Sequence, residues 1–84
     1  NFHVVLPYDP AKKEMYKKIR EFNDLLIKKG LELNGTITGE HGVGLHKKEY
    51  LLEEHPDNIP LMKLIKRSID QNNIMNPGKI FDLN

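Results

Sequence analysis

A run of six residues with three glycines does most to limit the folds open to this chain of 84 residues. The run is Gly39-Glu40-His41-Gly42-Val43-Gly44, and Lys47 follows it closely. Glycine adopts backbone angles that other residues avoid, and it lets a ligand approach the main chain closely. The run therefore predicts a sharply bent loop, and its adjacent carboxylate and imidazole indicate a site for proton transfer or metal binding.

The residues before the glycine run indicate a strand, a helix and a second strand. Residues 2–8 mix aromatic and β-branched types, which is typical of a strand. The pair Asp9-Pro10 suits the start of a helix, and Gly30 suits its end. Between them, apolar residues recur at helical spacing: Ala11, Met15, Ile19, Phe22 and Leu26. Residues 31–38 alternate weakly and predict a second strand with a turn or bulge at Gly35.

The residues after the glycine run indicate two helices and an irregular end. We expect a short helix over residues 47–54 and a longer one from residue 58 to about residue 71, with Asp57 as its N-cap. The expected buried face of the longer helix consists of Leu61, Leu64, Ile65 and Ile69. Residues 72–78 predict a loop, because Asn, Pro and Gly are frequent there.

The predicted order of elements is strand, helix, strand, glycine-rich loop, helix and helix. This β-α-β order followed by two helices indicates an α+β or α/β architecture. Two strands alone are too few for a stable sheet, so we expect either further strands from a longer parent protein or pairing of two copies of the chain into a dimer. The chain also begins with Asn1 rather than Met, which favours a fragment.

Composition excludes several classes of protein. Thirteen Lys and Arg balance twelve Asp and Glu, so the net charge of +1 gives no support for nucleic-acid binding. The absence of cysteine excludes disulfides and thiol chemistry, and it fits a reducing, cytoplasmic location. No apolar run approaches the roughly 20 residues that span a bilayer. Peripheral attachment of a full-length protein to a membrane stays open.

Two residues suggest a metal site. Imidazole and carboxylate ligands suit divalent ions such as Zn²⁺ and Mn²⁺, and His3 and Glu40 could contribute to one such centre. Catalytic metal sites commonly use three protein ligands, so one would be missing. The alternative is that His3 is a half-buried strand residue with a single hydrogen-bond partner.

His41 is the candidate general base, because imidazole exchanges protons near neutral pH. The alternative is a plain connecting loop with incidental polar residues. The loop does not match the patterns of phosphate-binding loops. Lys47 lies at the start of a predicted helix, where a cation is disfavoured, so it is either an anion-binding residue or a solvated lysine. Asn76-Pro77-Gly78-Lys79 is most simply a type I or type II turn.

Three motifs occur in order along the chain: Asn1-Phe2-His3, the run from Gly35 to Gly44 with Lys47, and the run Ile74-Met75-Asn76-Pro77-Gly78-Lys79-Ile80-Phe81. Together they resemble the C-terminal part of FAD-linked oxidases, in the group that includes D-lactate dehydrogenase and the glycolate oxidase D subunit. The resemblance covers essentially the whole chain. It implies a ferredoxin-like α+β fold and places residues 1–84 as the C-terminal segment of the substrate (cap) domain.

The resemblance also implies a function. The parent protein would oxidise a small 2-hydroxy acid and pass hydride from its carbon to FAD, which would be bound mainly by an FAD-binding domain absent from this chain. The isolated chain would be inactive. The partners would be that domain, the substrate and an electron-accepting subunit. The alternative is a small metal-binding or anion-binding module that uses His3, Glu40 and His41.

Site roles follow residue by residue from the same resemblance. His41 matches the residue that takes the substrate's hydroxyl proton, and Lys47 matches a lysine of the substrate region. Asn76 and Lys79 match the turn beside the flavin. In metal-dependent members, the positions of His3 and Glu40 bind a divalent metal together with a further His that would lie upstream of Asn1. Val5 stands where some relatives have a substrate-contacting Asn, so the substrate stays open among glycolate, D-lactate and longer acids.

Overall fold

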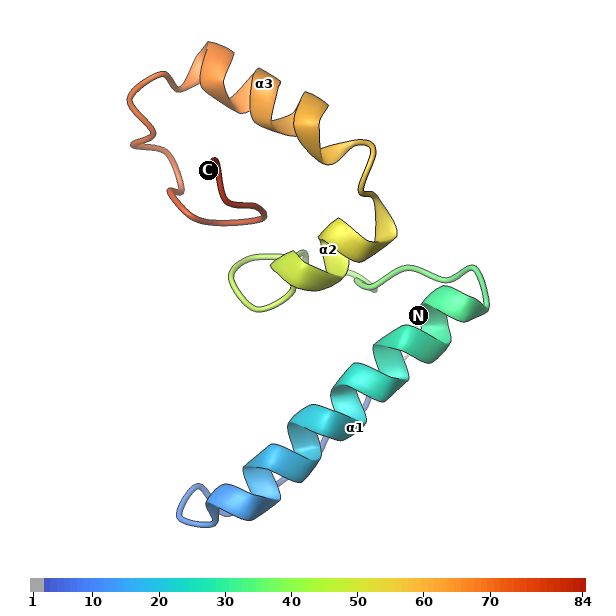
Figure 1. Cartoon of the computed structure of the whole chain (residues 1–84). Coiled ribbons are helices and arrows are strands. Elements are labelled where there is room, and N and C mark those ends of the chain that lie inside the picture. Colours follow the sequence, from blue (N-terminus) through green and yellow to red (C-terminus); the bar gives the residue numbers. More distant parts are fainter. Residues whose placement is uncertain (1–2) are drawn as a thin grey trace. The chain divides into compact units, whose positions relative to one another are not determined.

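A computed structural model describes residues 3–84 of the chain. It contains three helices, α1 (Lys13–Glu32), α2 (Lys48–Glu54) and α3 (Ile59–Ile69), joined by loops (Figure 1). The chain divides into two units, an N-terminal unit of residues 1–40 and a C-terminal unit of residues 41–84. The boundary falls inside the glycine run, so the feature that was expected to bend the chain also separates its two units.

The predicted β-α-β arrangement, and with it the ferredoxin-like fragment, is wrong for the described residues. None of residues 3–84 is in a strand, and residues 3–8 run without regular hydrogen bonding, with the side chain of Val5 83% exposed. Phe2, the first residue of the predicted strand, lies outside the described residues. A strand requires a neighbour to pair its backbone N–H and C=O groups, and the sequence pattern alone does not supply one.

Helix α1 begins three residues later than Pro10 suggests. Asp9 accepts a hydrogen bond from the backbone N–H of Ala11 at 3.0 Å, and its own carbonyl accepts the N–H of Lys12 at 2.9 Å. These bonds form a tight turn of the kind that Asp side chains favour, and the helix follows it. The N-cap residue is Lys12, which makes no side-chain capping bond.

The end of α1 corrects two further predictions. The helix continues through Gly30 and includes Leu31, so residues 31–32 belong to it and not to a second strand. The N–H of Gly35 donates to the carbonyl of Gly30 at 2.7 Å, and the N–H of Asn34 donates to that of Leu31 at 3.1 Å. With Asn34 at a φ of 62°, this is the Schellman arrangement. Asn34 therefore provides the left-handed residue that Gly30 was expected to provide.

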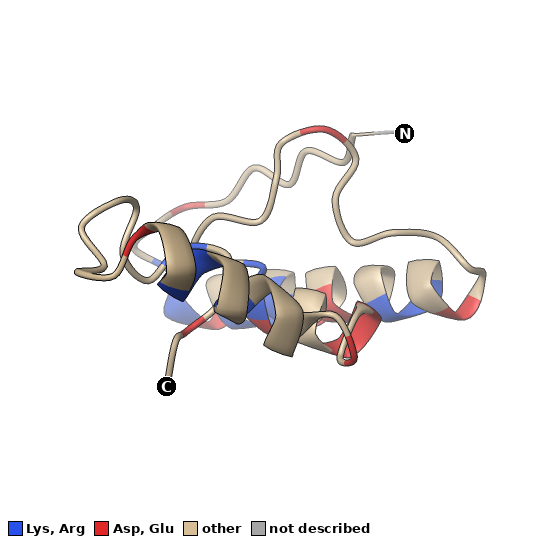
Figure 2. Ribbon diagram, turned by 90° about the horizontal axis from the view of Figure 1, so that it is seen from above, with Lys and Arg blue, Asp and Glu red and all other residues tan. Residues whose placement is uncertain are grey.

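Charged residues of both signs occur along α1, as the blue and red segments of the ribbon show (Figure 2). Lys28 pairs with Asp24 at 3.1 Å, and Lys29 pairs with Glu32 at 3.3 Å, at spacings of four and three residues. Such pairs contribute only a few tenths of a kcal/mol each on an exposed helix. Within the described residues, no helix is both long enough and apolar enough to cross a membrane.

Both helices of the C-terminal unit were predicted to within two residues at each end. Pro60 occupies the first turn of α3, where its missing N–H costs nothing. The N-cap of α3 is Asn58 rather than Asp57, and no side chain caps this end. The backbone bond from the N–H of Asn58 to the carbonyl of His55 at 3.1 Å closes the turn between α2 and α3 instead.

Few apolar side chains are buried. Among the described residues, the buried apolar residues are Ile37, Leu51 and Ile59. The chain exposes 7100 Å² of surface, against roughly 5,200 Å² for a folded monomer of its mass. The predicted buried face of α3 is wrong, because its members are 51–76% exposed: Leu61, Leu64, Ile65 and Ile69. The sequence pattern gave the helix correctly, but nothing in the described residues covers that face.

The two glycines at the end of α1 provide a matched test of this geometry. We expect Gly30→Ala to stabilise the helix by about 0.5–1 kcal/mol, because a Cβ at Gly30 meets no atom within 4 Å and alanine favours helix. We expect Gly35→Ala to destabilise it by about 1–3 kcal/mol, because a Cβ there would lie 2.8 Å from the carbonyl oxygen of Gly30. Helix content against temperature, measured by circular dichroism, checks both; equal effects of the two changes would contradict the geometry.

Candidate functional site

The structure brings His3 and Glu40 together within the N-terminal unit. His3 Nε2 lies 2.9 Å from Glu40 Oε1, and the two side chains are 58% and 57% exposed. The two residues come from opposite ends of the unit, before and after α1, so their contact depends on the path of the chain around that helix. His3 is exposed and is not in a strand, which removes the alternative of a half-buried strand histidine.

This pair has the chemistry of a metal-ligand set. An imidazole nitrogen and a carboxylate oxygen each bind Zn²⁺ at about 2.0–2.2 Å, so two ligands of one tetrahedral ion lie roughly 3.4 Å apart. The observed separation of 2.9 Å is shorter than this, and it is the usual length of a direct hydrogen bond. The donor atoms therefore fit a metal without requiring one.

The glycine loop, residues 39–44, has the bend that its composition predicts. Gly42 and Gly44 have φ values of 82° and 56°, a region that residues with a Cβ rarely adopt. His41 is exposed at the start of the C-terminal unit, directly after Glu40 in the chain. The carbonyl of Val43 then accepts the N–H of Lys47 at 3.3 Å, and this bond leads into α2.

Two lysines lie at the start of α2. Lys47 is the N-cap residue of this helix, and no side chain caps the helix end. Lys48 donates to Asp82 Oδ1 at 2.9 Å, and the Lys48 side chain is 25% exposed. The bond brings the C-terminal tail of the chain next to α2. The prediction that Lys47 binds substrate is not tested by this geometry.

The N-P-G-K turn, residues 76–79, is a hydrogen-bonded turn as expected. The N–H of Lys79 donates to the carbonyl of Asn76 at 3.3 Å, and Gly78 has a φ of 74°. A proline in the second position and a positive φ in the third indicate type II. Immediately after the turn, the N–H of Ile80 donates to the carbonyl of Gly44 at 2.7 Å, which joins the turn to the glycine loop.

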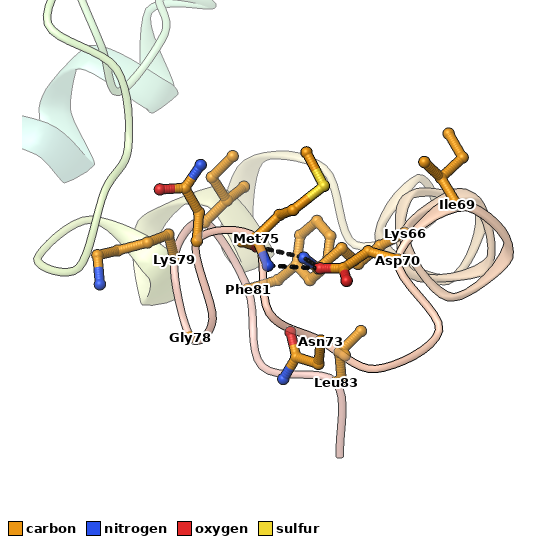
Figure 3. Close-up of a pocket in the computed structure, with 11 residues that line it drawn as sticks. Lys66, Ile69, Asp70, Asn73, Met75, Gly78, Lys79, Phe81 and Leu83 are labelled. Atoms are coloured by element: carbon orange, nitrogen blue, oxygen red, sulfur yellow. Dashed lines mark hydrogen bonds and ion pairs between the residues drawn. The ribbon is translucent and has the colours of Figure 1, made fainter.

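A buried carboxylate lies at the end of α3, before the loop that leads into this turn (Figure 3). Asp70, 7% exposed, follows the last residue of α3. Its Oδ1 accepts the N–H of Ile74 at 3.0 Å and its Oδ2 accepts that of Met75 at 2.9 Å. Lys66, one turn earlier on α3, donates its ammonium group to Asp70 Oδ2 and to the carbonyl of Met75. We call these four residues the Asp70 cluster.

These partners explain the acidity of the carboxyl group. The hydrogen bond from the Lys66 ammonium, helped by the N–H groups of Met75 and Ile74, lowers the pKa of Asp70 to about 2, although burial acts in the opposite direction. Asp70 is therefore ionised at any ordinary pH, and its charge is compensated by one cation and two backbone dipoles.

A cavity of about 260 Å³ lies beside the Asp70 cluster and the turn. Its walls are mainly apolar, with Ile69, Ile80 and Phe81 among the residues that form them, and Asn76 and Lys79 also line it. Asn73 contributes a buried side-chain oxygen that accepts no hydrogen bond from residues 3–84. Two residues that the sequence analysis assigned to the flavin thus share one cavity, whereas His3 and Glu40 belong to the other unit.

Sequence reasoning missed Asp70, Lys66 and Asn73. The spacing of four residues between Lys66 and Asp70 was a usable signal, because it places the two side chains on one face at the end of a helix. The hydrogen bonds from two backbone N–H groups to Asp70 leave no signal in the sequence, because every residue type except proline has a backbone N–H at positions 74 and 75.

The acidity of Asp70 gives a pH prediction. Because its folded-state pKa of about 2 lies below the ordinary 3.8, the ionised form stabilises the cluster fully above about pH 4, and this contribution is lost as the pH falls through about 2. We expect the amide proton signals of Ile74 and Met75 in NMR spectra to shift with a midpoint near 2. Asp70→Asn should abolish the shift, and Asp82→Asn should leave it in place. A midpoint near 4 would contradict the cluster.

Comparison with known proteins connects these features to a family. Residues 1–80 match the family described as FAD linked oxidases, C-terminal domain. The chain is 42% identical over 84 residues to a probable mitochondrial D-lactate dehydrogenase of Danio rerio, covering 99% of this chain and 17% of that protein. It is 39% identical over 82 residues to the glycolate oxidase subunit GlcD of Bacillus subtilis, covering 96% of this chain and 17% of that protein.

A third relative broadens the range of named substrates. The chain is 38% identical over 82 residues to a D-2-hydroxyglutarate dehydrogenase of Stutzerimonas stutzeri, covering 96% of this chain and 18% of that protein. The chain therefore spans less than a fifth of the length of these relatives. No solved structure gives a significant match. The match over residues 1–80 confirms the resemblance inferred from the three motifs: this chain belongs to the family of FAD-linked oxidase C-terminal domains.

Proposed function

We propose that this chain is the C-terminal segment of the substrate domain of a flavin-dependent 2-hydroxy-acid dehydrogenase or oxidase. Membership of the family supports this proposal. The structural observation that carries it is the 2.7 Å bond from Ile80 to Gly44, because it joins the glycine loop to the N-P-G-K turn within one unit. A loop that handles the substrate and a turn that contacts the flavin must be neighbours if one reaction uses both.

The residues of the glycine loop fit the acid–base part of such a reaction. Oxidation of an alcohol removes a proton from the oxygen and a hydride from the carbon. His41 is exposed on a bent loop and has the side chain best suited to accept the proton near neutral pH. FAD, when bound, accepts the hydride. Lys47, six residues further on, is the proposed contact for the substrate carboxylate.

The cavity at the N-P-G-K turn fits one edge of a flavin. Apolar walls with an amide and an ammonium group at Asn76 and Lys79 suit a flat ring system with polar edge atoms. Its volume of about 260 Å³ is below the usual range of roughly 300–1,000 Å³ for complete cofactor sites. Most contacts to FAD must therefore come from an FAD-binding domain, which is the principal proposed partner.

His3 and Glu40 are the proposed ligands of a divalent metal such as Zn²⁺ or Mn²⁺. Their closeness in space and their donor atoms support the assignment. A metal here would polarise the substrate hydroxyl. The same pair favours the second candidate function, a metal-binding or anion-binding module that acts on its own with His41.

Partners and location are proposed at a coarser level. The names of the relatives include D-lactate, glycolate and D-2-hydroxyglutarate, so the proposed substrate is a small 2-hydroxy acid without a choice among them. An electron-accepting subunit and a dimer of this chain stay predictions. A cytoplasmic location also stays a prediction, since two of these relatives come from bacteria and the name of the third includes the word mitochondrial.

Titration of the isolated chain separates the two candidate functions. We expect no stoichiometric flavin absorbance after incubation with FAD, because one partial cavity supplies too few contacts. We expect calorimetry with Zn²⁺ to give weak binding that His3→Ala removes, because the side chains of His3 and Glu40 are both more than half exposed to water. Saturable FAD binding would contradict the assignment of the main flavin site elsewhere. Tight Zn²⁺ binding would favour the independent module.

Replacement of His41 in the parent enzyme tests the proposed base. We expect His41→Asn to lower kcat by about 10²–10⁴-fold, the usual contribution of a general base, while the flavin spectrum stays unchanged. His46→Asn is the matched control, because His46 is an exposed histidine five residues further along and has no proposed role. Equal losses in both variants, or no loss in His41→Asn, would contradict the assignment.

A further inference from the structure

The Asp70 cluster fixes the backbone at the entrance to the N-P-G-K turn. Met75, the residue before Asn76, is held through both of its backbone polar groups. Its N–H donates to Asp70 Oδ2 at 2.9 Å, and its carbonyl accepts the ammonium group of Lys66. Since the peptide unit between Met75 and Asn76 contains that carbonyl, the Lys66 contact sets the plane from which the turn begins.

The cluster uses both carboxylate oxygens and involves charge throughout. Asp70 Oδ1 accepts the N–H of Ile74 at 3.0 Å, and Oδ2 accepts both Met75 and Lys66. Hydrogen bonds with an ionised partner are roughly twice as strong as neutral ones. The side chains are also shielded from water, with Asp70 5% and Lys66 20% exposed. The contact is therefore stronger than an ordinary surface pair at the same spacing.

The far end of the same segment is held by other groups. The N–H of Ile80 donates to the carbonyl of Gly44 at 2.7 Å, Lys48 pairs with Asp82 at 2.9 Å, and Arg67 donates to the carbonyl of Leu83. The turn thus lies between two anchors, and Asn76 and Lys79 reach the cavity from the stretch between them. The anchor on the α3 side is the one that contains a buried charge.

We propose that Asp70 and Lys66 are positioning residues for the flavin contact, which hold the N-P-G-K turn so that Asn76 and Lys79 face the cofactor. This inference rests on the proposed function, in which the turn contacts FAD. Neither residue is proposed to take part in the chemical step. Asp70 acts on the turn through Ile74 and Met75, and Lys66 acts on it through Met75.

A purely structural role is the competing explanation. Asp70 is the C-cap residue of α3, and under this explanation its contacts only end the helix. In that case, replacement would change the stability of the enzyme but leave the bound flavin as it is. The absorption spectrum and the affinity of FAD, both measured on folded variants of the enzyme, therefore distinguish the two roles.

The experiment uses the parent enzyme, with FAD as the probe. We expect Asp70→Asn and Lys66→Met to speed hydrogen exchange in the segment 74–80, to weaken FAD affinity by about tenfold or more, and to shift the visible absorption of the bound flavin. We expect Lys66→Arg to restore much of this behaviour, because arginine keeps the charge and several donors. Asp57→Asn is the matched control, since it removes an exposed carboxylate that takes part in neither anchor.

The outcomes separate the inference from the proposed function on which it rests. If Asn76→Ala and Lys79→Ala alter the flavin spectrum while Asp70→Asn and Lys66→Met do not, the positioning role is wrong and the flavin contact stands. If Asn76→Ala and Lys79→Ala leave the flavin spectrum unchanged, the proposed flavin contact is wrong. If, in addition, Asp70→Asn leaves the rate of hydrogen exchange in segment 74–80 unchanged, the proposal that Asp70 holds this segment is also wrong. Should Asp70→Asn fail to fold, the pair Lys66→Met and Lys66→Arg decides the question.

Discussion

The contact between the Asp70 carboxylate and its three donors is the constraint on which the C-terminal unit depends. This unit buries few apolar side chains, with Leu51 and Ile59 as its buried apolar residues, so packing alone does little to fix its irregular C-terminal half. A buried carboxylate must satisfy its oxygens or lose its charge. The oxygens of Asp70 accept backbone N–H groups of the following loop, and these hydrogen bonds fix the path of the chain through that loop.

The helices were predictable because their signals are local. Apolar residues at spacings of three and four predicted α1 and α3 to within three residues at each end, and α2 was predicted to within one residue. The strands were not predictable, since a run such as residues 3–8 becomes a strand only beside a partner, and the described residues offer none. The same limit applies to burial: the apolar stripe of α3 is real, but burial requires a second surface.

The candidate site divides along similar lines. Residue type suggested the histidine and the carboxylate that the structure places 2.9 Å apart, and the family resemblance assigned both to a metal. The glycines and the proline predicted the bend of the glycine loop and the turn at residues 76–79. The Asp70 cluster escaped notice, because two of its three donors are main-chain groups that every sequence contains. The end of α1 at Asn34 was not predicted, because glycine is the usual residue in the left-handed conformation after a helix. Gly30, four positions earlier, therefore indicated the end of the helix.

One backbone angle in the C-terminal unit has a wider consequence. Ile80 has a φ of 72°, which is unfavourable for a β-branched residue and costs on the order of 1–3 kcal/mol. Its N–H bond to Gly44 helps to keep it there, so the glycine loop and the turn share one conformational equilibrium. Paired substitutions, one in each segment, should consequently be non-additive, because relaxation of either segment relieves the other. Under the proposed function, acid–base chemistry at the glycine loop and flavin contact at the turn would therefore be coupled.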